Sequence, residues 1–487
     1  MLACAPASAS VYTFTSVLDS TQQQISTNSQ CLAPSINAAG TLAFLAGSGS
    51  ARGIYKGSGG ALTLIADTTF GGQTRLFDET GCHGPSINDA GDVAFYASVP
   101  SAALDGIYVG NGGAVSTVAD SSGAFAPFGG ANPFVMINES GDIPFVARFD
   151  LAGPEALYVG DTTGIAALYT SINSPFDGYV GGPSINDAGS VAFFGFSSTT
   201  ASDGLFVGNG GAPTQLYDDN GGVCSISYET GIDSLSRATY AGEFGTSCVG
   251  DTVVYLASPT GSAPLVSGPV VPFWFDPPSF NNNGRMAFNG GPLGGPNGVF
   301  TGGQTSSAVI RVGDALFSST VTSVQIGRQG LNDSGHVAFW YKLANGRTGY
   351  ARANLIPDCQ NGIDDDADGK IDLLDAGCAN AADLSERTTL YLCDDGLDND
   401  ADTLIDYPFD PGCAHAKAKK ENPPCNDGLD NDGDTFIDYP ADTFCTSASG
   451  GAEVAPPPGS GGCGIGPELA LGLPLLAWAR RRRRDNL

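Results

Sequence analysis

The sequence is poor in basic side chains, in histidine and in long apolar runs. Its 487 residues include 21 lysines and arginines against 51 aspartates and glutamates, a formal net charge of −30 at pH 7. Such a charge argues against nucleic-acid binding and favours the attraction of metal cations. Only three histidines occur, His83, His336 and His415. No Gly-x-Ser-x-Gly, His-Glu-x-x-His or phosphate-loop motif is present, so the sequence gives enzyme chemistry little support.

What the sequence does contain is a phrase, Ser-Ile-Asn-x-x-Gly-x-Val-Ala-Phe, that returns at intervals of 47 to 51 residues, by subtraction of the positions of its asparagines. Six copies are clear, and a seventh is degraded, with aspartate in place of asparagine. The residues at this position are Asn37, Asn88, Asn138, Asn186, Asp233, Asn281 and Asn332. Short segments rich in valine and aromatic residues, separated by glycine and asparagine, predict strands, and a repeat of this length is typical of a propeller blade.

The two ends of the repeat region indicate how the ring closes. The last unit stops after its third strand, at residues 349–354, whereas Val11–Asp19 has the pattern of a fourth strand. We therefore expect the N-terminal strand to complete the last blade, which a competing right-handed β-helix would not need. The predicted fold class is all-β: a seven-bladed β-propeller over residues 11–354, closed by the N-terminal strand.

Twelve cysteines in so acidic a chain favour disulfides and an oxidising compartment. Cys31 and Cys82 occupy equivalent points on adjacent repeats and could bridge them, and Cys224 and Cys248 bracket the degraded unit. Six more cysteines frame three acidic blocks within residues 355–450. These blocks are Cys359–Cys378, Cys393–Cys413 and Cys425–Cys445.

The three blocks carry carboxylates at alternate positions, a spacing that lets a loop wrap around a hard cation. We predict calcium sites, because the available ligands are carboxylate and carbonyl oxygens and the cysteines are accounted for by disulfides. An unstructured acidic linker is the alternative. The predicted ligands are Asp364, Asp366, Asp368, Asp372 and Asp375 in the first block, Asp398, Asp400, Asp402 and Asp406 in the second, and Asp430, Asp432, Asp434 and Asp438 in the third.

The first block fits a calcium loop best, because Gly369 supplies the sharp turn at the sixth loop position. Thr403 and Thr435 replace this glycine in the other blocks, and their final carboxylates, Asp410 and Asp442, come one place late. These differences predict altered geometry or weaker binding in the second and third blocks.

Parts of the chain resemble three known families of repeats. The acidic blocks resemble thrombospondin type 3 calcium repeats and, more closely, the Cys-x-Asp-Gly-x-Asp-Asn-Asp modules of surface proteins from myxobacteria and their relatives. Residues 11–354 resemble the Asn-x-x-Gly-x-x-Ala-Phe repeat family of exported bacterial proteins. The resemblance implies display on the cell surface and no particular activity.

The terminal segments suggest export and attachment. Residues 1–10 end like a signal-peptidase site and are interpreted as the remnant of a signal peptide, and residues 451–462 form a linker of proline, glycine and serine. Residues 463–487 combine a Gly-Cys-Gly sequence, a short hydrophobic helix and an arginine cluster, and the apolar run is short for a membrane span. They resemble the myxobacterial C-terminal sorting signal, which implies processing near Cys463; a plain hydrophobic anchor is the alternative.

These features lead to two functional hypotheses. The first is a cell-surface binding or structural protein, with a propeller head on a calcium-stabilised stalk, a surface protein or polysaccharide as its unknown ligand, and envelope attachment through the tail. The second is a secreted, calcium-dependent hydrolase or lyase that acts on polysaccharide or peptide at the propeller mouth, where His83 is the candidate base. Carboxylates converging at one face of the ring would favour the enzyme, and an uncharged mouth the scaffold.

Overall fold

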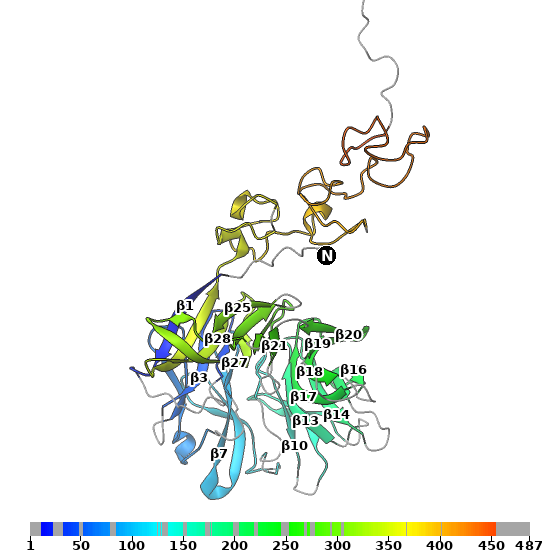
Figure 1. Cartoon of the computed structure of the whole chain (residues 1–487). Helices are drawn as coiled ribbons and strands as arrows, with labels where there is room; N and C mark the ends of the chain where they lie inside the picture. The colour runs from blue at the N-terminus through cyan, green and yellow to red at the C-terminus, as the bar shows by residue number, and fades with distance from the viewer. Residues whose placement is uncertain are drawn as a thin grey trace, which may run out of the picture. The chain divides into compact units, whose positions relative to one another are not determined.

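The computed structural model forms two units, Met1–Ile356 and Pro357–Leu487 (Figure 1). It describes residues 11–453 except for short gaps. The gaps are 23–32, 48–51, 78–83, 124, 127, 129–134, 150–152, 171–175, 177, 198–203, 219–222, 245–252, 267–269, 273–277, 293–294, 303–305, 367 and 401. The predicted leader, the sorting helix, His83 and Cys463 lie outside the described residues, as do Cys31, Cys82 and Cys248.

The first unit is a seven-bladed β-propeller, as the repeat predicts, and each blade is one antiparallel sheet. Blade 1 consists of β2 (Ser35–Ile36), β3 (Leu42–Ala46), β4 (Gly53–Gly57) and β5 (Thr63–Asp67). Blade 2 consists of β6 (Ser86–Ile87), β7 (Val93–Val99), β8 (Leu104–Gly110) and β9 (Ser116–Asp120). Blade 3 consists of β10 (Ile143–Ala147), β11 (Ala156–Gly160) and β12 (Ile165–Tyr169). Blade 4 consists of β13 (Gly178–Ile185), β14 (Val191–Phe196), β15 (Gly204–Gly208) and β16 (Thr214–Asp218). Blade 5 consists of β17 (Val223–Ile232), β18 (Ala238–Phe244), β19 (Val253–Ser258) and β20 (Gly261–Val266).

The last two blades depart slightly from this plan. In blade 6, β21 (Val270–Pro272) and β22 (Ser279–Phe280) both pair with β23 (Met286–Pro292), followed by β24 (Gly298–Gly302) and β25 (Ser306–Arg311). Blade 7 consists of β26 (Ala315–Leu316), β27 (Ser319–Leu331), β28 (Val337–Leu343), β29 (Thr348–Leu355) and β1 (Tyr12–Asp19). Short 3-10 turns occur at Phe70–Gly72, Pro100–Ala102, Asp358–Gln360, Asp372–Leu374 and Leu392–Asp394.

β1 closes the ring as the sequence predicts. It runs antiparallel to β29, with Tyr12 opposite Leu355 and Asp19 opposite Gly349. The Asp19 carboxylate also accepts hydrogen bonds from the Arg347 guanidinium and the Tyr341 hydroxyl of the last blade. Burial alone would raise the pKa of Asp19, but these donors and the Thr21 amide outweigh it and lower the pKa to about 2.

The core lies between neighbouring blades and is built from the repeated aromatic residue. Leu42 and Phe44 of blade 1, for example, pack in one cluster with Trp340 and Tyr350 of blade 7. The aromatic side chain seven residues after each repeat position is buried in every blade. These residues are Phe44, Phe95, Phe145, Phe193, Tyr240, Phe288 and Phe339. Because each sheet packs against a neighbouring blade on both of its faces, its inner strands are apolar on both faces, as the sequence pattern indicates.

A hydrogen-bonded ring formed by the repeat asparagines links the blades at one face. The Nδ2 of Asn37 donates to the carbonyl oxygen of Asn88 at 3.1 Å, and Asn332 closes the circle by donating to the carbonyl oxygen of Asn37 at 2.9 Å. Asn88, Asn138, Asn186 and Asn281 make the same bond to the following blade. Asp233 cannot donate, and its carboxylate instead binds Arg237 of its own turn. The degraded repeat therefore interrupts the ring between blades 5 and 6.

Candidate functional site

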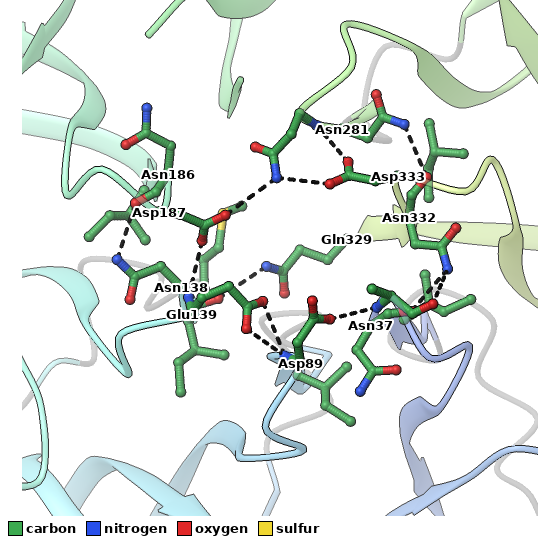
Figure 2. A pocket seen from close by; sticks show the side chains of 18 of the residues that line it. Asn37, Asp89, Asn138, Glu139, Asn186, Asp187, Asn281, Gln329, Asn332 and Asp333 are labelled. Atoms are coloured by element: carbon green, nitrogen blue, oxygen red, sulfur yellow. Dashed lines mark hydrogen bonds between the residues drawn. The ribbon is translucent and has the colours of Figure 1, made fainter. Parts of the chain in front are cut away.

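A pocket at the mouth of the central channel is lined by all seven blades, by the Asn-x-x-Gly turn region in six of them and by Ile232 in blade 5. The cavity measures about 130 Å³, and Figure 2 shows the side chains of the turns around it. Each Oδ1 of the repeat position accepts the amide N–H four residues later, as Asn88 does from Asp92 at 2.9 Å, which fixes the turn. The same structural position is thereby repeated around the pocket.

The residue after the repeat asparagine is acidic in four blades and gives the mouth its charge. Asp89, Glu139, Asp187 and Asp333 occupy this position, and all four line the pocket. Asp89 accepts the amide N–H of Ala38 at 2.6 Å, and Asp187 accepts that of Glu139 at 3.1 Å. The carboxylates therefore join adjacent blades as well as lining the cavity. Burial raises the pKa of Glu139, and the neighbouring aspartates add to this increase.

A detour in β27 fills the middle of the pocket. Residues 327–330 lie between Ile326, paired with Phe339, and Leu331, paired with Val337. Gln329 reaches toward the opposite blades, where it accepts the Ser86 hydroxyl and donates to the carbonyl oxygen of Ile137 (Figure 2). Arg328 donates to the carbonyl oxygens of Gly182 and Thr230 at 2.9 and 2.7 Å. Register shifts at residues 181–183 of β13 and 228–230 of β17 resemble this detour, which explains why the sequence shows no special insertion in any one blade.

The described histidines do not reach the mouth pocket. Nδ1 of His336 accepts the amide N–H of Leu355 at 3.1 Å, and burial lowers the pKa of the imidazole. His415 is exposed in the second unit. The polar groups that line the mouth are carboxylates, amides and backbone groups.

The second unit contains the three predicted disulfides. Cys359–Cys378, Cys393–Cys413 and Cys425–Cys445 have Cα–Cα distances of 5.6, 5.8 and 5.7 Å. These disulfides point to an extracellular or otherwise oxidising environment. Among the described residues no helix is both long and apolar enough to cross a membrane.

The three acidic loops inside the disulfides fold alike. In the first loop Asp364, Asp366 and Asp368 gather around one point, and in the second Asp398, Asp400 and Asp402 do so. One oxygen of the leading aspartate accepts an amide N–H five residues on at 3.0 Å in every loop, from Gly369 to Asp364, Thr403 to Asp398 and Thr435 to Asp430. The following aspartates accept amides two residues on, as Asp432 does from Asp434 and Asp434 does from Phe436.

The carboxylate that closes each loop is buried and occupies the same place in all three blocks. Asp375, Asp410 and Asp442 are at most 5 % exposed, and one oxygen of each accepts an amide N–H two residues later. The other oxygen of Asp375 and of Asp442 has no hydrogen-bond partner. Asp410 and Asp442 therefore correspond to Asp375, although their sequence offset differs by one residue.

Sequence reasoning missed a buried glutamate in each block. Glu386, Glu421 and Glu453 are each 1 % exposed, and each accepts amide N–H groups with both carboxylate oxygens. Glu386 groups with Asp366 and Asp375, Glu421 with Asp410, and Glu453 with Asp442. Each glutamate follows the second cysteine of its block by eight residues, a spacing repeated three times that could have identified it.

The aspartates at the ninth loop position serve the backbone. Asp372 accepts the amide N–H of Gly362, Asp406 those of Asp395 and Gly396, and Asp438 those of Asp427 and Gly428. Asp406 also pairs with Arg387. Their carboxylates thus hold the turn that precedes each loop, whereas the alternate aspartates of the first two loops and the three closing aspartates lie in groups of neighbouring carboxylates.

The donor set fits a hard cation. Several carboxylates lie within reach of one another, and burial, followed by their mutual repulsion, raises the pKa of Asp375 to about 6 despite the Gly377 amide. The sulfur atoms of Cys413 and Cys445 lie in two of the groups but are bonded in disulfides and are not thiolates. The available donors are therefore carboxylate oxygens.

Comparison with known proteins gives distant structural similarities and one family for the chain. The β-propeller domain of the Trilobed protease from Pyrococcus furiosus is similar over 70 % of this chain and 99 % of that chain, with 10 % identity and a TM-score of 0.41. Prolyl oligopeptidase B from Galerina marginata is similar over 69 % of this chain, with 9 % identity and a TM-score of 0.40, and the match spans 48 % of that protein. No curated protein matches the sequence. Residues 15–290 match the model of a family of unknown function, DUF7453, and the chain belongs to this family.

Proposed function

We propose that the protein is an exported binding or structural protein of the cell surface, with a closed propeller head and a module that calcium stabilises. The observation that carries the proposal is the pair of buried carboxylate oxygens, on Asp375 and Asp442, that lack a hydrogen-bond partner within a group of carboxylates. A buried, unpaired carboxylate is costly unless a cation or a proton neutralises it. Calcium would supply that charge in all three blocks.

Calcium would give the module a rigidity that its small core cannot supply. The large apolar side chains in the loops, including Leu374, Leu397 and Leu429, are 82 %, 60 % and 62 % exposed, so apolar burial contributes little there. Disulfides and bound cations are the usual means by which such small units are held. The resemblance to surface repeats and the sorting-like tail near Cys463 support attachment to the envelope. The head would bind a surface protein or polysaccharide.

The test is a calorimetric titration of calcium into the full-length, chelator-treated protein with its disulfides intact. We expect saturable binding of about one ion per loop, with much weaker binding of magnesium, which prefers a smaller octahedral site. Replacing the second aspartate of each loop, Asp366, Asp400 and Asp432, with alanine should remove the binding. As a control, Asp187→Asn at the propeller mouth should leave it intact. Absence of saturable calcium binding to the unaltered protein would refute the proposal.

A secreted hydrolase or lyase is the second candidate, because carboxylates do converge at one face of the ring. Asp89, Glu139, Asp187 and Asp333 share the mouth pocket, and the pKa of Glu139 is raised, as a general acid requires. The test is an assay of sugar and peptide release from mixed polysaccharide and protein substrates. An activity that Glu139→Gln abolishes, without a change in thermal unfolding, would support an enzyme; inactivity of the unaltered protein on all substrates would count against it.

A further inference from the structure

The first cysteine of each acidic block is followed by a polar residue that differs from block to block. These residues are Gln360, Asp394 and Asn426. Gln360 is exposed, whereas Asp394 is 2 % exposed, and one of its carboxylate oxygens has no hydrogen-bond partner. A buried carboxylate oxygen without a hydrogen-bond partner is unfavourable unless a proton or a cation neutralises it. The groups around Asp394 therefore indicate its role.

Asp394 faces the loop of the preceding block. Burial, followed by the Asp366 carboxyl group beside it and then by Asp375, raises the pKa of Asp394. Asp366 and Asp375 are the buried carboxylates that group with Glu386 in the first block. Asp394, with its unpartnered oxygen, therefore lies beside the first loop but outside its disulfide.

Contacts between the two blocks hold Asp394 in this place. Thr388, in the connecting segment, donates its amide N–H to the carbonyl oxygen of Asp394 at 2.8 Å. Arg387 pairs with Asp406 of the second block and donates to the carbonyl oxygen of Asp366 at 3.5 Å. The orientation of the second block is thus tied to the wall of the first loop.

Asn426 stands in the same relation to the second loop. A Cβ atom added to Gly412 would lie 2.8 Å from Nδ2 of Asn426, so this amide group lies directly beside Gly412. The amide N–H of Gly412 donates to Asp410, the carboxylate that closes the second loop. Asn426 thus places a neutral amide group beside the second loop, where Asp394 places a carboxyl group beside the first. The sequence after Glu453 contains no fourth block of this kind.

The loop carboxylates are buried more deeply in the first loop than in the other two. Asp366 and Asp368 of the first loop are 8 % and 9 % exposed. Asp402 of the second loop is exposed, and Asp432 and Asp434 of the third are half-buried. The first loop, which a following block covers with a carboxylate, is the most enclosed of the three.

We propose that the acidic blocks form a chain of cation sites in which each loop is completed by the block that follows it. Asp394 supplies a charged ligand to the first site, Asn426 a neutral ligand to the second, and the third site depends on its own loop. The inference rests on the proposed calcium binding and adds an order of affinity, first above second above third, because affinity rises with the number of charged ligands. Filling a site also fixes the next block against it.

The experiment is a calcium titration of full-length protein, by calorimetry, with three variants. Asp394→Ala should weaken the tightest site about tenfold or more, or remove one bound ion. Asn426→Asp adds a carboxylate and should strengthen the second site about tenfold, a gain that misfolding cannot imitate. Gln360→Ala changes the same position in the first block, where no loop precedes it, and should leave all affinities unchanged.

The outcomes separate this inference from the calcium proposal. If the unaltered chain binds calcium but Asp394→Ala and Asn426→Asp bind it with unchanged affinities, the sites are independent and the chain of sites is refuted, while the calcium proposal stands. If the unaltered chain binds no calcium, both fail. An equal loss of affinity in Gln360→Ala would also overturn the inference, because the position would then matter without a preceding loop.

Discussion

At the scale of the residue, one asparagine per blade performs two tasks. Its Oδ1 fixes the turn in which it lies, and its Nδ2 bonds to the next blade, as in the 3.1 Å bond from Asn138 to the carbonyl oxygen of Asn186. Aspartate can perform the first task only, which is what Asp233 does. The preference for asparagine thus reflects contact between blades as well as turn formation.

Replacing Asn138 with aspartate should therefore destabilise the propeller by about 2 kcal/mol, because a buried donor is lost and a negative charge is placed beside Glu139 and Asp187. Chemical denaturation followed by fluorescence measures the change. The control is Asn345→Asp in an exposed turn, where little change is expected. Equal stability of Asn138→Asp and the unaltered protein would show that the inter-blade bond contributes nothing.

A second prediction at this scale concerns the sixth position of the acidic loops. Thr403 and Thr435 adopt φ values of 78° and 80°, close to the 89° of Gly369, so the turn is the same and the threonines bear the strain. Thr403→Gly should stabilise the calcium-bound second loop by about 1 kcal/mol and tighten its binding. Calorimetric titration tests this, with Gly369→Thr as the reciprocal variant. Weaker calcium binding by the second loop in Thr403→Gly would contradict the explanation that Thr403 is strained.

At the scale of the element, closure of the ring depends on β1 and on the Asp19 carboxylate at its end. The folded pKa of about 2 lies below the ordinary 3.8, so this carboxylate contributes stability above pH 3.8 that is lost as the pH falls through 2. We expect Asp19→Asn to lower the unfolding free energy at pH 7 by about 2 kcal/mol, and the difference from the unaltered protein to vanish near pH 2.

Unfolding by denaturant at several pH values measures this difference. The matched control is Asp67→Asn, since Asp67 ends the corresponding outer strand β5 of blade 1 but is exposed and bonds to Thr69. A pH-independent difference for Asp19→Asn would assign the loss to packing, and no difference would show that the ion pair does not hold the closing strand.

At the scale of the whole molecule, the two units have separate sources of stability. The apolar clusters of the propeller contain residues of the first unit alone. Calcium should therefore raise the unfolding temperature of the second unit, with a gain of about 2.7 kcal/mol at a hundredfold excess over the dissociation constant, and leave the propeller transition in place. Differential scanning calorimetry with and without chelator tests this; a calcium-dependent shift of both transitions would contradict it.

The sequence predicted most of the architecture because the propeller repeats one local pattern seven times. The blade count, the closing strand Val11–Asp19 and the three disulfides could be predicted from spacing alone. The Gln329 detour and the orientation of Asp394 could not, since both depend on which distant segments the fold brings together. Glu386, Glu421 and Glu453 were missed because they lie outside the cysteine frame in which the ligands were sought.

The pairing of β1 with β29 also constrains the order in which the molecule can assemble. Tyr12 finds its partner, Leu355, only after all the intervening blades exist, so β1 is synthesised before the other strands of the propeller and is paired after them. Until then blade 7 presents an open edge and β1 remains a free strand with a matching sequence. Two newly made chains side by side could therefore exchange their β1 strands before either ring had closed.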